Sequence, residues 1–227
     1  MNTLEICVDT PDDLAAAIEA QVDRIELCSA LDLGGLTPTP GMIELAKGSD
    51  VPIYAMIRPR AGDFIYSPSE IRSMEADIAA MRSAGFERVV FGALNRDKTL
   101  DIATLSRLCA AAGDMGKTLH RAVDEMPLPR TAVQTAIDLG FERILTSGGA
   151  NTAVEGLDEI VEMNSVANGK IEIMAGSGVS YRVIDQLGRA GIHSFHASCR
   201  EPIGDDGAKR LNINALAKTL SAVSRSG

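Results

Sequence analysis

The sequence predicts a single (β/α)₈ barrel. Eight β-branched or apolar runs recur along the 227 residues, each followed by an amphipathic helix pattern, at a spacing of about 28 residues per unit. Helix start and stop signals fall between these runs and support the count. A flavodoxin-like open sheet is the alternative, but eight regular units exceed what that fold needs. We therefore expect one domain over residues 1–227, with its functional groups at the carboxyl ends of the strands.

Local patterns define the individual elements. The predicted strands are Leu4–Asp9, Arg24–Cys28, Pro52–Arg60, Arg88–Leu94, Lys117–Asp124, Arg143–Gly149, Lys170–Gly178 and His193–Cys199. The first helix pattern begins with Thr10 as the N-cap and Pro11 as the first helical residue, and Ser67 to Glu70 form a capping box for a later helix. Glycines end other helix patterns just before the next strand, at Gly85, Gly113, Gly140 and Gly191. The longest segments without periodicity follow strands and are Ser29–Pro40, Pro59–Tyr66 and Arg200–Asn212.

Composition excludes several classes of protein. A net charge of −9 and a pI near 4.9 argue against nucleic acid or an anionic membrane as partners, because both need clustered Lys and Arg. There is no apolar stretch of membrane-spanning length and no signal-peptide pattern, so we expect a cytoplasmic protein. The four cysteines do not form a disulfide framework, and Cys109 fits a helix as a small apolar residue. Barrels of this kind often pair, and we expect a homo-oligomer.

The predicted barrel interior is unusually polar. Side chains alternate along a strand, and the apolar set should face the helices, which leaves the other set inside. This inner set consists of Glu5, Cys7, Asp9, Glu26, Cys28, Met56, Arg58, Arg60, His120, Asp124, Ser147, Glu172, Met174, His196 and Ser198. Buried ions must pair with one another, with a metal or with a ligand. One interpretation is a purely structural network in which Glu5 and Glu26 hold Arg58 and Arg60.

The same residues carry a family resemblance. Ten strings match in order and spacing from residue 4 to about 199, namely EIC (5–7), DRIELC (23–28), GGLTP (34–38), MIRPR (56–60), GDFIYS (62–67), FGAL (91–94), LHRAVDE (119–125), ILTSGG (144–149), IEIMAGSGV (171–179) and FHAS (195–198). Together they resemble the CutC family, which is known for (β/α)₈ barrels and named for copper homeostasis. Two positions depart from the family pattern. Ala61 stands where R-G-G-D-F has a glycine, and Arg210-Leu211-Asn212 replaces the common Phe-Arg-Asn ending.

The resemblance implies copper handling, and the first hypothesis is a Cu(I)-binding protein. Cys7 and Cys28 lie on adjacent predicted strands, each two residues after an interior glutamate. Thiolate is the soft ligand that Cu(I) prefers, and Met56 or Met174 could add a thioether. Family members are suggested to bind Cu(I) through the cysteines that match these two. The alternative is that both cysteines are small core residues.

The second hypothesis is an enzyme that acts on a small anionic metabolite, phosphorylated or not. Arg58 and Arg60 end the third predicted strand, where guanidinium groups can bind carboxylate or phosphate. Glycine-rich turns before helices offer backbone N–H groups to an anion. The candidate ligand-binding residues of these turns and of the last strand are Ser147, Gly148, Gly176, Gly178 and Ser198.

Histidines and carboxylates supply the candidate catalytic groups. His120 could act as a general acid or base oriented by Asp124 or Glu26, and His196 is a second candidate. The alternative for His120 is a neutral side chain bonded to a neighbouring carboxylate. No lysine occupies a late interior strand position, which disfavours a Schiff-base aldolase. Isomerisation, epimerisation and lyase chemistry remain, and the sequence leaves open whether the protein is an enzyme.

Overall fold

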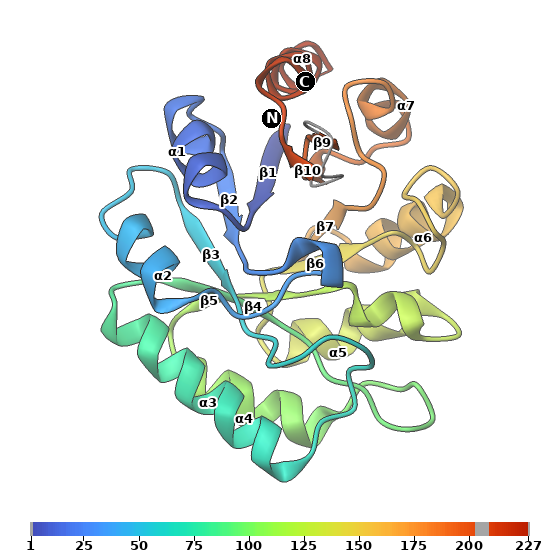
Figure 1. Cartoon of the computed structure of the whole chain (residues 1–227). Coiled ribbons are helices and arrows are strands. Elements are labelled where there is room, and N and C mark those ends of the chain that lie inside the picture. Colours follow the sequence, from blue (N-terminus) through green and yellow to red (C-terminus); the bar gives the residue numbers. More distant parts are fainter. Residues whose placement is uncertain (1, 203–208, 227) are drawn as a thin grey trace.

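The computed structural model describes residues 2–202 and 209–226 and has the predicted closed barrel of eight parallel strands, in the order β1 to β8 with β8 paired back to β1 (Figure 1). The strands are shorter than predicted because their ends turn into loops. They are β1 (Thr3–Val8), β2 (Arg24–Leu27), β3 (Ile53–Met56), β4 (Arg88–Phe91), β5 (Gly116–Leu119), β6 (Arg143–Thr146), β7 (Glu172–Ala175) and β8 (Ser194–Ala197).

Helices surround the barrel, as Figure 1 shows. They are α1 (Pro11–Glu19), α2 (Pro40–Ala46), α3 (Pro68–Ser83), α4 (Ile102–Ala112), α5 (Ala132–Asp138), α6 (Leu157–Ala167), α7 (Ile184–Arg189) and α8 (Ile213–Arg225). The predicted caps are confirmed: the Thr10 side chain accepts from the Asp13 N–H, and Ser67 and Glu70 form a reciprocal capping box. Short 3₁₀ helices lie in the loops, at η1 (Leu31–Leu33), η2 (Arg121–Glu125) and η3 (Pro129–Thr131).

The apolar core fills the space between the strands and the helices. The side chains predicted to face the helices, including Ile6, Ile25 and Phe195, are fully buried in one large apolar cluster with helix residues such as Leu14 and Ile78. Since alternate residues of the strands belong to this layer, the remaining set must point to the barrel axis. The fold therefore places polar residues of the strands, such as Glu5, Glu26 and His196, inside the barrel, as predicted.

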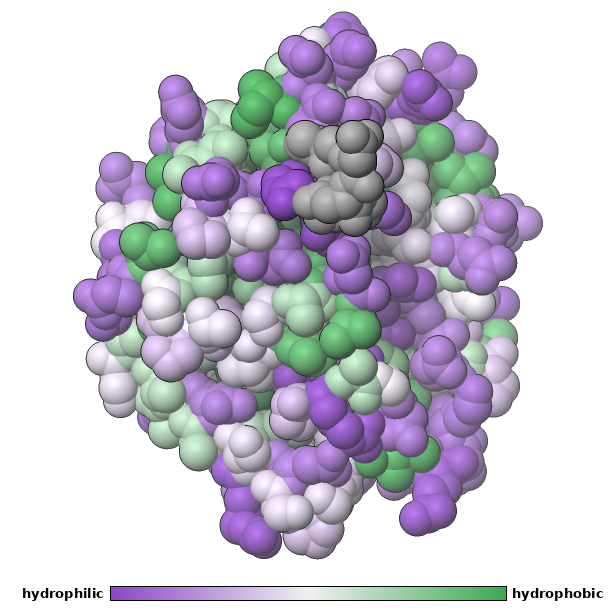
Figure 2. All heavy atoms as spheres, in the orientation of Figure 1, coloured by the Kyte–Doolittle hydropathy of each residue, from purple (hydrophilic) through white to green (hydrophobic). Residues whose placement is uncertain are grey.

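The loops at the carboxyl ends of the strands shape the site. The loop after β2 carries η1, which crosses in front of the barrel in Figure 1, and Figure 2 shows a group of hydrophobic side chains near the middle of the same face. The predicted loop Arg200–Asn212 contains two short antiparallel strands, β9 (Arg200–Pro202) and β10 (Lys209–Leu211), and residues 203–208 between them lie outside the described residues. Within the described part of the chain, no helix has the length and apolarity needed to cross a bilayer.

Candidate functional site

A network of ion pairs fills the amino-terminal end of the barrel. The Glu172 carboxylate accepts from Arg24 and Arg143, with Oε1 2.8 Å from a nitrogen of each. Glu5 lies 3.4 Å from Arg24 and 3.9 Å from Arg143. Burial acts to raise the pKa of Glu172, but the hydrogen bonds from the two arginines outweigh it and lower the pKa to about 2. Each charge in this layer therefore has an opposite charge beside it.

The structural network predicted from the sequence has different members. Glu5 pairs with Arg24 and Arg143 and not with Arg58 or Arg60. The sequence prediction did not include Arg24 and Arg143, because both lie at the starts of their strands. The signal was present: Arg24 has the same alternation as Glu26, and Arg143 the same as Ser147.

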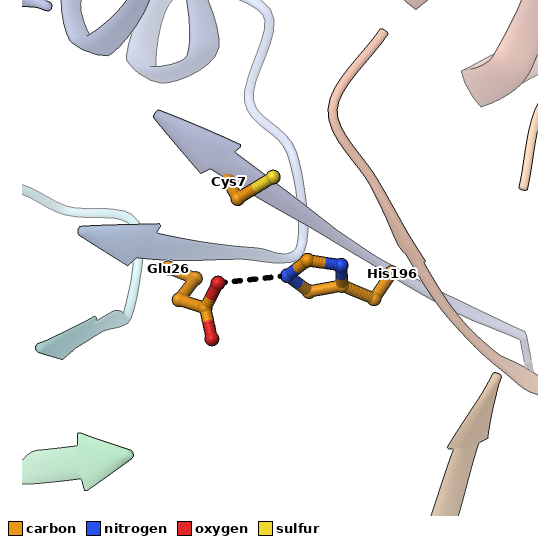
Figure 3. A group of neighbouring side chains, drawn as sticks. All are labelled: Cys7, Glu26 and His196. Atoms are coloured by element: carbon orange, nitrogen blue, oxygen red, sulfur yellow. Dashed lines mark hydrogen bonds and ion pairs between the residues drawn. The ribbon is translucent and has the colours of Figure 1, made fainter. Parts of the chain in front are cut away.

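A second polar cluster lies nearer the carboxyl end and joins β1, β2 and β8. The strand register pairs Cys7 with Glu26 and Glu5 with His196. The His196 Nε2 atom is 2.9 Å from Glu26 Oε2, and the Cys7 side chain lies above this pair (Figure 3). One ligand atom each from Cys7, Glu26 and His196 lies within 4.8 Å of the others, the spacing of a possible metal site.

The two candidate metal ligands from the sequence occupy different places. Cys7 belongs to this cluster and lines the cavity described below. Cys28 is fully buried behind it, where its Sγ donates to Glu26 Oε2 at 3.6 Å. Burial, followed by the nearby charge of Glu26, raises the pKa of both thiols well above the ordinary value.

His196 and Glu26 form an ion pair. Burial opposes charge on both groups, but their mutual attraction and hydrogen bond raise the pKa of His196 and lower that of Glu26. Burial raises the pKa of Glu5. Among the described residues, both Glu5 oxygens and Glu26 Oε1 are buried without a hydrogen-bond partner. The cluster thus offers acceptor atoms that the protein itself leaves unused.

A cavity of about 570 Å³ opens above this cluster at the carboxyl end of the barrel. Eight of the predicted site residues line it, namely Cys7, Glu26, Arg58, His120, Asp124, Gly178, His196 and Ser198. Arg121, Phe64 and Ser177 also line it, and the sequence interpretation did not include them. The cavity has the size and the location expected of a small-molecule site in this fold.

His120 is held in a fixed orientation at the end of β5. Its Nδ1 accepts a hydrogen bond from the Ala122 N–H at 3.2 Å, so η2 orients the ring and not Asp124 or Glu26 as expected. Phe64 packs on the ring with 4.8 Å between centroids. Burial, and then the charge of Arg58, lower the pKa of His120 to about 4. His120 is therefore a neutral imidazole near pH 7.

Arg58 holds two loops together. Its guanidinium donates to the carbonyls of Leu33, Gly34 and Gly35 after β2 and to that of Gly62 after β3, and it lies over the Phe64 ring at 4.7 Å. Among the described residues, no carboxylate forms an ion pair with it. Its positive charge therefore stays uncompensated next to the cavity.

Asp124 and Ser147 organise the turn after β6. Asp124 accepts from Thr146 Oγ1 at 2.5 Å and from the Ser147 and Gly149 N–H groups, and it pairs with Arg121 Nε at 2.8 Å. Ser147 is fully buried and accepts from Arg121 Nη2 at 3.0 Å. This network fixes Arg121 at the cavity wall.

Other predicted ligand residues do not line the cavity. They are Arg60, Ser147, Gly148 and Gly176. Arg60 was predicted to point inward, but β3 ends at Met56, and Arg60 instead pairs with Asp63 on the loop that leaves the barrel and with Glu70 in the first turn of α3. Gly176 packs beside Leu145, which leaves no space for a side chain.

A closed parallel barrel with a polar cavity at its carboxyl end is a (β/α)₈ barrel with its site in the usual place of that fold. The sequence profile of the CutC family matches residues 2–201. A CutC family protein of Rhizobium meliloti is 50% identical over 206 residues, which cover 89% of this chain and 84% of the relative. The human copper homeostasis protein cutC homolog is 40% identical over 221 residues, covering 96% of this chain and 81% of the relative. CutC from Streptococcus agalactiae has a structure similar to this one, with a TM-score of 0.82 at 31% identity, covering 86% of this chain and 98% of that one. The chain belongs to the CutC family.

Proposed function

We propose that this protein binds a copper ion in the cytoplasm, with Cys7, Glu26 and His196 as the site and Cys28 as a second thiol behind it. The observation that carries the proposal is the group of three ligand atoms, one from each of three strands, within 4.8 Å of one another. Thiolate and imidazole both suit copper. Family membership supports a copper link, since a human relative is named for copper homeostasis.

Copper must displace protons from this site. The pKa values of Cys7 and Cys28 are raised by burial, so both thiols are protonated near pH 7. Because only the thiolate binds copper, the affinity rises with pH and binding releases protons. The unpartnered oxygens of Glu5 and Glu26 favour an added positive charge at this place.

Anaerobic Cu(I) titration against a competing chelator tests the proposal. We expect a Cys7→Ser variant to lose at least about tenfold in Cu(I) affinity, because replacing even a residue that only supports the ligands of a metal site has an effect of this size. A Cys109→Ser variant is the matched control, because Cys109 is half-buried on α4, away from the site. Unchanged affinity in the Cys7→Ser/Cys28→Ser double variant would show that copper does not bind here.

A second candidate function is an enzyme of the isomerase, epimerase or lyase type acting on a small anionic metabolite. It is favoured by the cavity of about 570 Å³, where the His196–Glu26 pair and His120 lie with two arginines. This function needs His196 and Glu26 for proton transfer and tolerates replacement of Cys28 by serine.

We also propose a homo-oligomer, which light scattering of the purified protein tests; a monomeric mass would contradict it.

A further inference from the structure

We propose that the cavity binds a small oxygen-bearing anion and that the Nε2–H of neutral His120 donates a hydrogen bond to an oxygen of this ligand. The inference deepens the second candidate function and is independent of copper binding. It replaces the acid–base role expected of His120 with that of a fixed donor.

The backbone selects the tautomer of His120. The Ala122 N–H points at Nδ1, so this nitrogen must be the acceptor. In a neutral imidazole the other nitrogen then carries the proton. The ring cannot easily turn over, because Phe64 packs on it and it lies close to Gly92, where an added Cβ would be 2.6 Å from Nδ1.

Within residues 2–202 and 209–226, the Nε2–H group has no acceptor. His120 is 3% exposed, and among the described residues its Nε2 is buried without a hydrogen-bond partner. A buried donor left unpaired is costly, and such groups in folded proteins normally meet a water molecule or a ligand. Since His120 lines the cavity, the missing acceptor belongs there.

The charge of Arg58 favours an anion in the cavity, because the carboxylates that line the cavity, Glu26, Asp124 and Glu125, each pair with another cation. Arg58 donates to loop carbonyl oxygens and lies over the Phe64 ring, and among the described residues no carboxylate forms an ion pair with it. Arg121 reaches the same cavity from η2, where Asp124 balances its charge, and it adds N–H donors to the wall. Glu26 and His196 lie on another part of the wall and provide the groups that can move a proton.

The arrangement separates two tasks within one cavity. A neutral imidazole donor beside an uncompensated arginine polarises a carbonyl, carboxylate or phosphate oxygen without giving up its proton. Proton transfer is left to the His196–Glu26 pair. An imidazole kept neutral by its surroundings is an established device for this kind of polarisation.

Nuclear magnetic resonance of the metal-free, ¹⁵N-labelled protein tests the inference. Long-range ¹H–¹⁵N correlations at pH 7 should give His120 the Nε2–H tautomer, and addition of pyruvate or inorganic phosphate, each alone, should shift its Nε2 signal. A response to pyruvate assigns a carbonyl or carboxylate ligand, and a response to phosphate alone assigns a phosphoryl ligand. An imidazolium or an Nδ1–H tautomer at pH 7, or no shift with either anion, would overturn the inference.

Variants distinguish a donor from a structural role. His120→Phe should weaken binding of the responding anion by about tenfold or more, and His120→Gln, which keeps an N–H donor, should restore most of the affinity. His193→Phe is the control, because His193 bonds to Asn2 at the other end of the barrel. Equal affinity in His120→Phe and the wild type would also overturn the inference. Anion binding without turnover of any substrate would contradict the enzyme function and leave this inference standing. Because a chelator keeps the protein free of copper in these experiments, their outcome does not depend on the Cu(I) titration.

Discussion

The two ends of the barrel interior use similar residues in opposite ways. At the amino-terminal end, Arg24 and Arg143 share Glu172, whose Oε1 atom lies 2.8 Å from a nitrogen of each. At the carboxyl end, the Nε2 of His120 and one oxygen of Glu26 are buried without partners among the described residues. The charges of the first layer balance one another, whereas the second layer faces a cavity of about 570 Å³ and leaves atoms unused.

This difference separates structural charge from charge available for function. A buried ion pair that is fully satisfied has no capacity left for a ligand, and breaking it mainly destabilises the fold. Unsatisfied groups beside a cavity cost stability until something binds to them. Glu5 joins the two layers, since it lies near Arg24 on one side and 3.9 Å from His196 on the other.

The largest expected effect is on the amino-terminal layer. In an Arg143→Met variant, Glu172 and Glu5 share Arg24 as their remaining arginine partner. Removing one partner of a buried pair typically lowers the free energy of unfolding by about 3–5 kcal/mol. Urea unfolding should show this loss, while Cu(I) affinity stays as in the wild type. Arg107→Ala, which breaks an exposed pair with Glu75, is the control and should change the midpoint little. Loss of copper binding with unchanged stability would reverse the assignment of the two layers.

The second effect is a pH dependence set by the carboxyl-end layer. The pKa of His120 is lowered from 6.5 to about 4, so between these values the unfolded chain binds a proton that the folded chain does not. The contribution of His120 to the free energy of unfolding is therefore fully present above pH 6.5. It is lost as the pH drops towards 4, by about 3 kcal/mol at about 1.4 kcal/mol per pKa unit. Urea unfolding from pH 7.5 to 4.5, taken as the difference from His120→Gln, isolates this contribution. A difference that does not vary with pH would contradict it.

A third, smaller effect concerns the space around His120. Gly92→Ala would put a Cβ 2.6 Å from the ring and should cost about 1–3 kcal/mol through overpacking. The substitution should also disturb the His120 tautomer in the same ¹⁵N spectra. Gly41→Ala is the matched control, because Gly41 lies in α2 and a Cβ added there would be 3.9 Å from Thr39 Oγ1, an ordinary contact distance. A neutral result at Gly92 would show that the ring is free to move.

Much of the architecture could be predicted from the sequence because hydrophobic periodicity and capping are local. Strand alternation correctly placed Cys7, Glu26 and His196 on one inner surface. It failed for Arg60 because alternation holds only within a strand, and β3 ends at Met56. The position of Cys28 behind Glu26 could not be predicted either, since it depends on how the loop carrying Gly35 packs against it.

The tautomer of His120 shows a further limit. The sequence identified the residue, but its hydrogen bond comes from Ala122, two positions along, where the chain turns into η2. A turn of this kind depends on the neighbouring loops, including the packing of Phe64. Candidate residues can therefore be found from spacing, whereas their protonation and direction need the three-dimensional surroundings.

The smallest expected effect sharpens the comparison at the rim. Arg60→Ala removes the ion pairs with Asp63 on the loop and with Glu70 at the start of α3, and such solvent-accessible pairs contribute little to stability in water. The midpoint of urea unfolding should hardly move, and both Cu(I) affinity and the anion response of His120 should match the wild type. Arg58, only two residues earlier in the sequence, lines the cavity and holds its loops. If Arg60→Ala abolished anion binding, the ligand would lie over the β3 loop and not inside the barrel mouth, and the division between the two layers would have to include the rim.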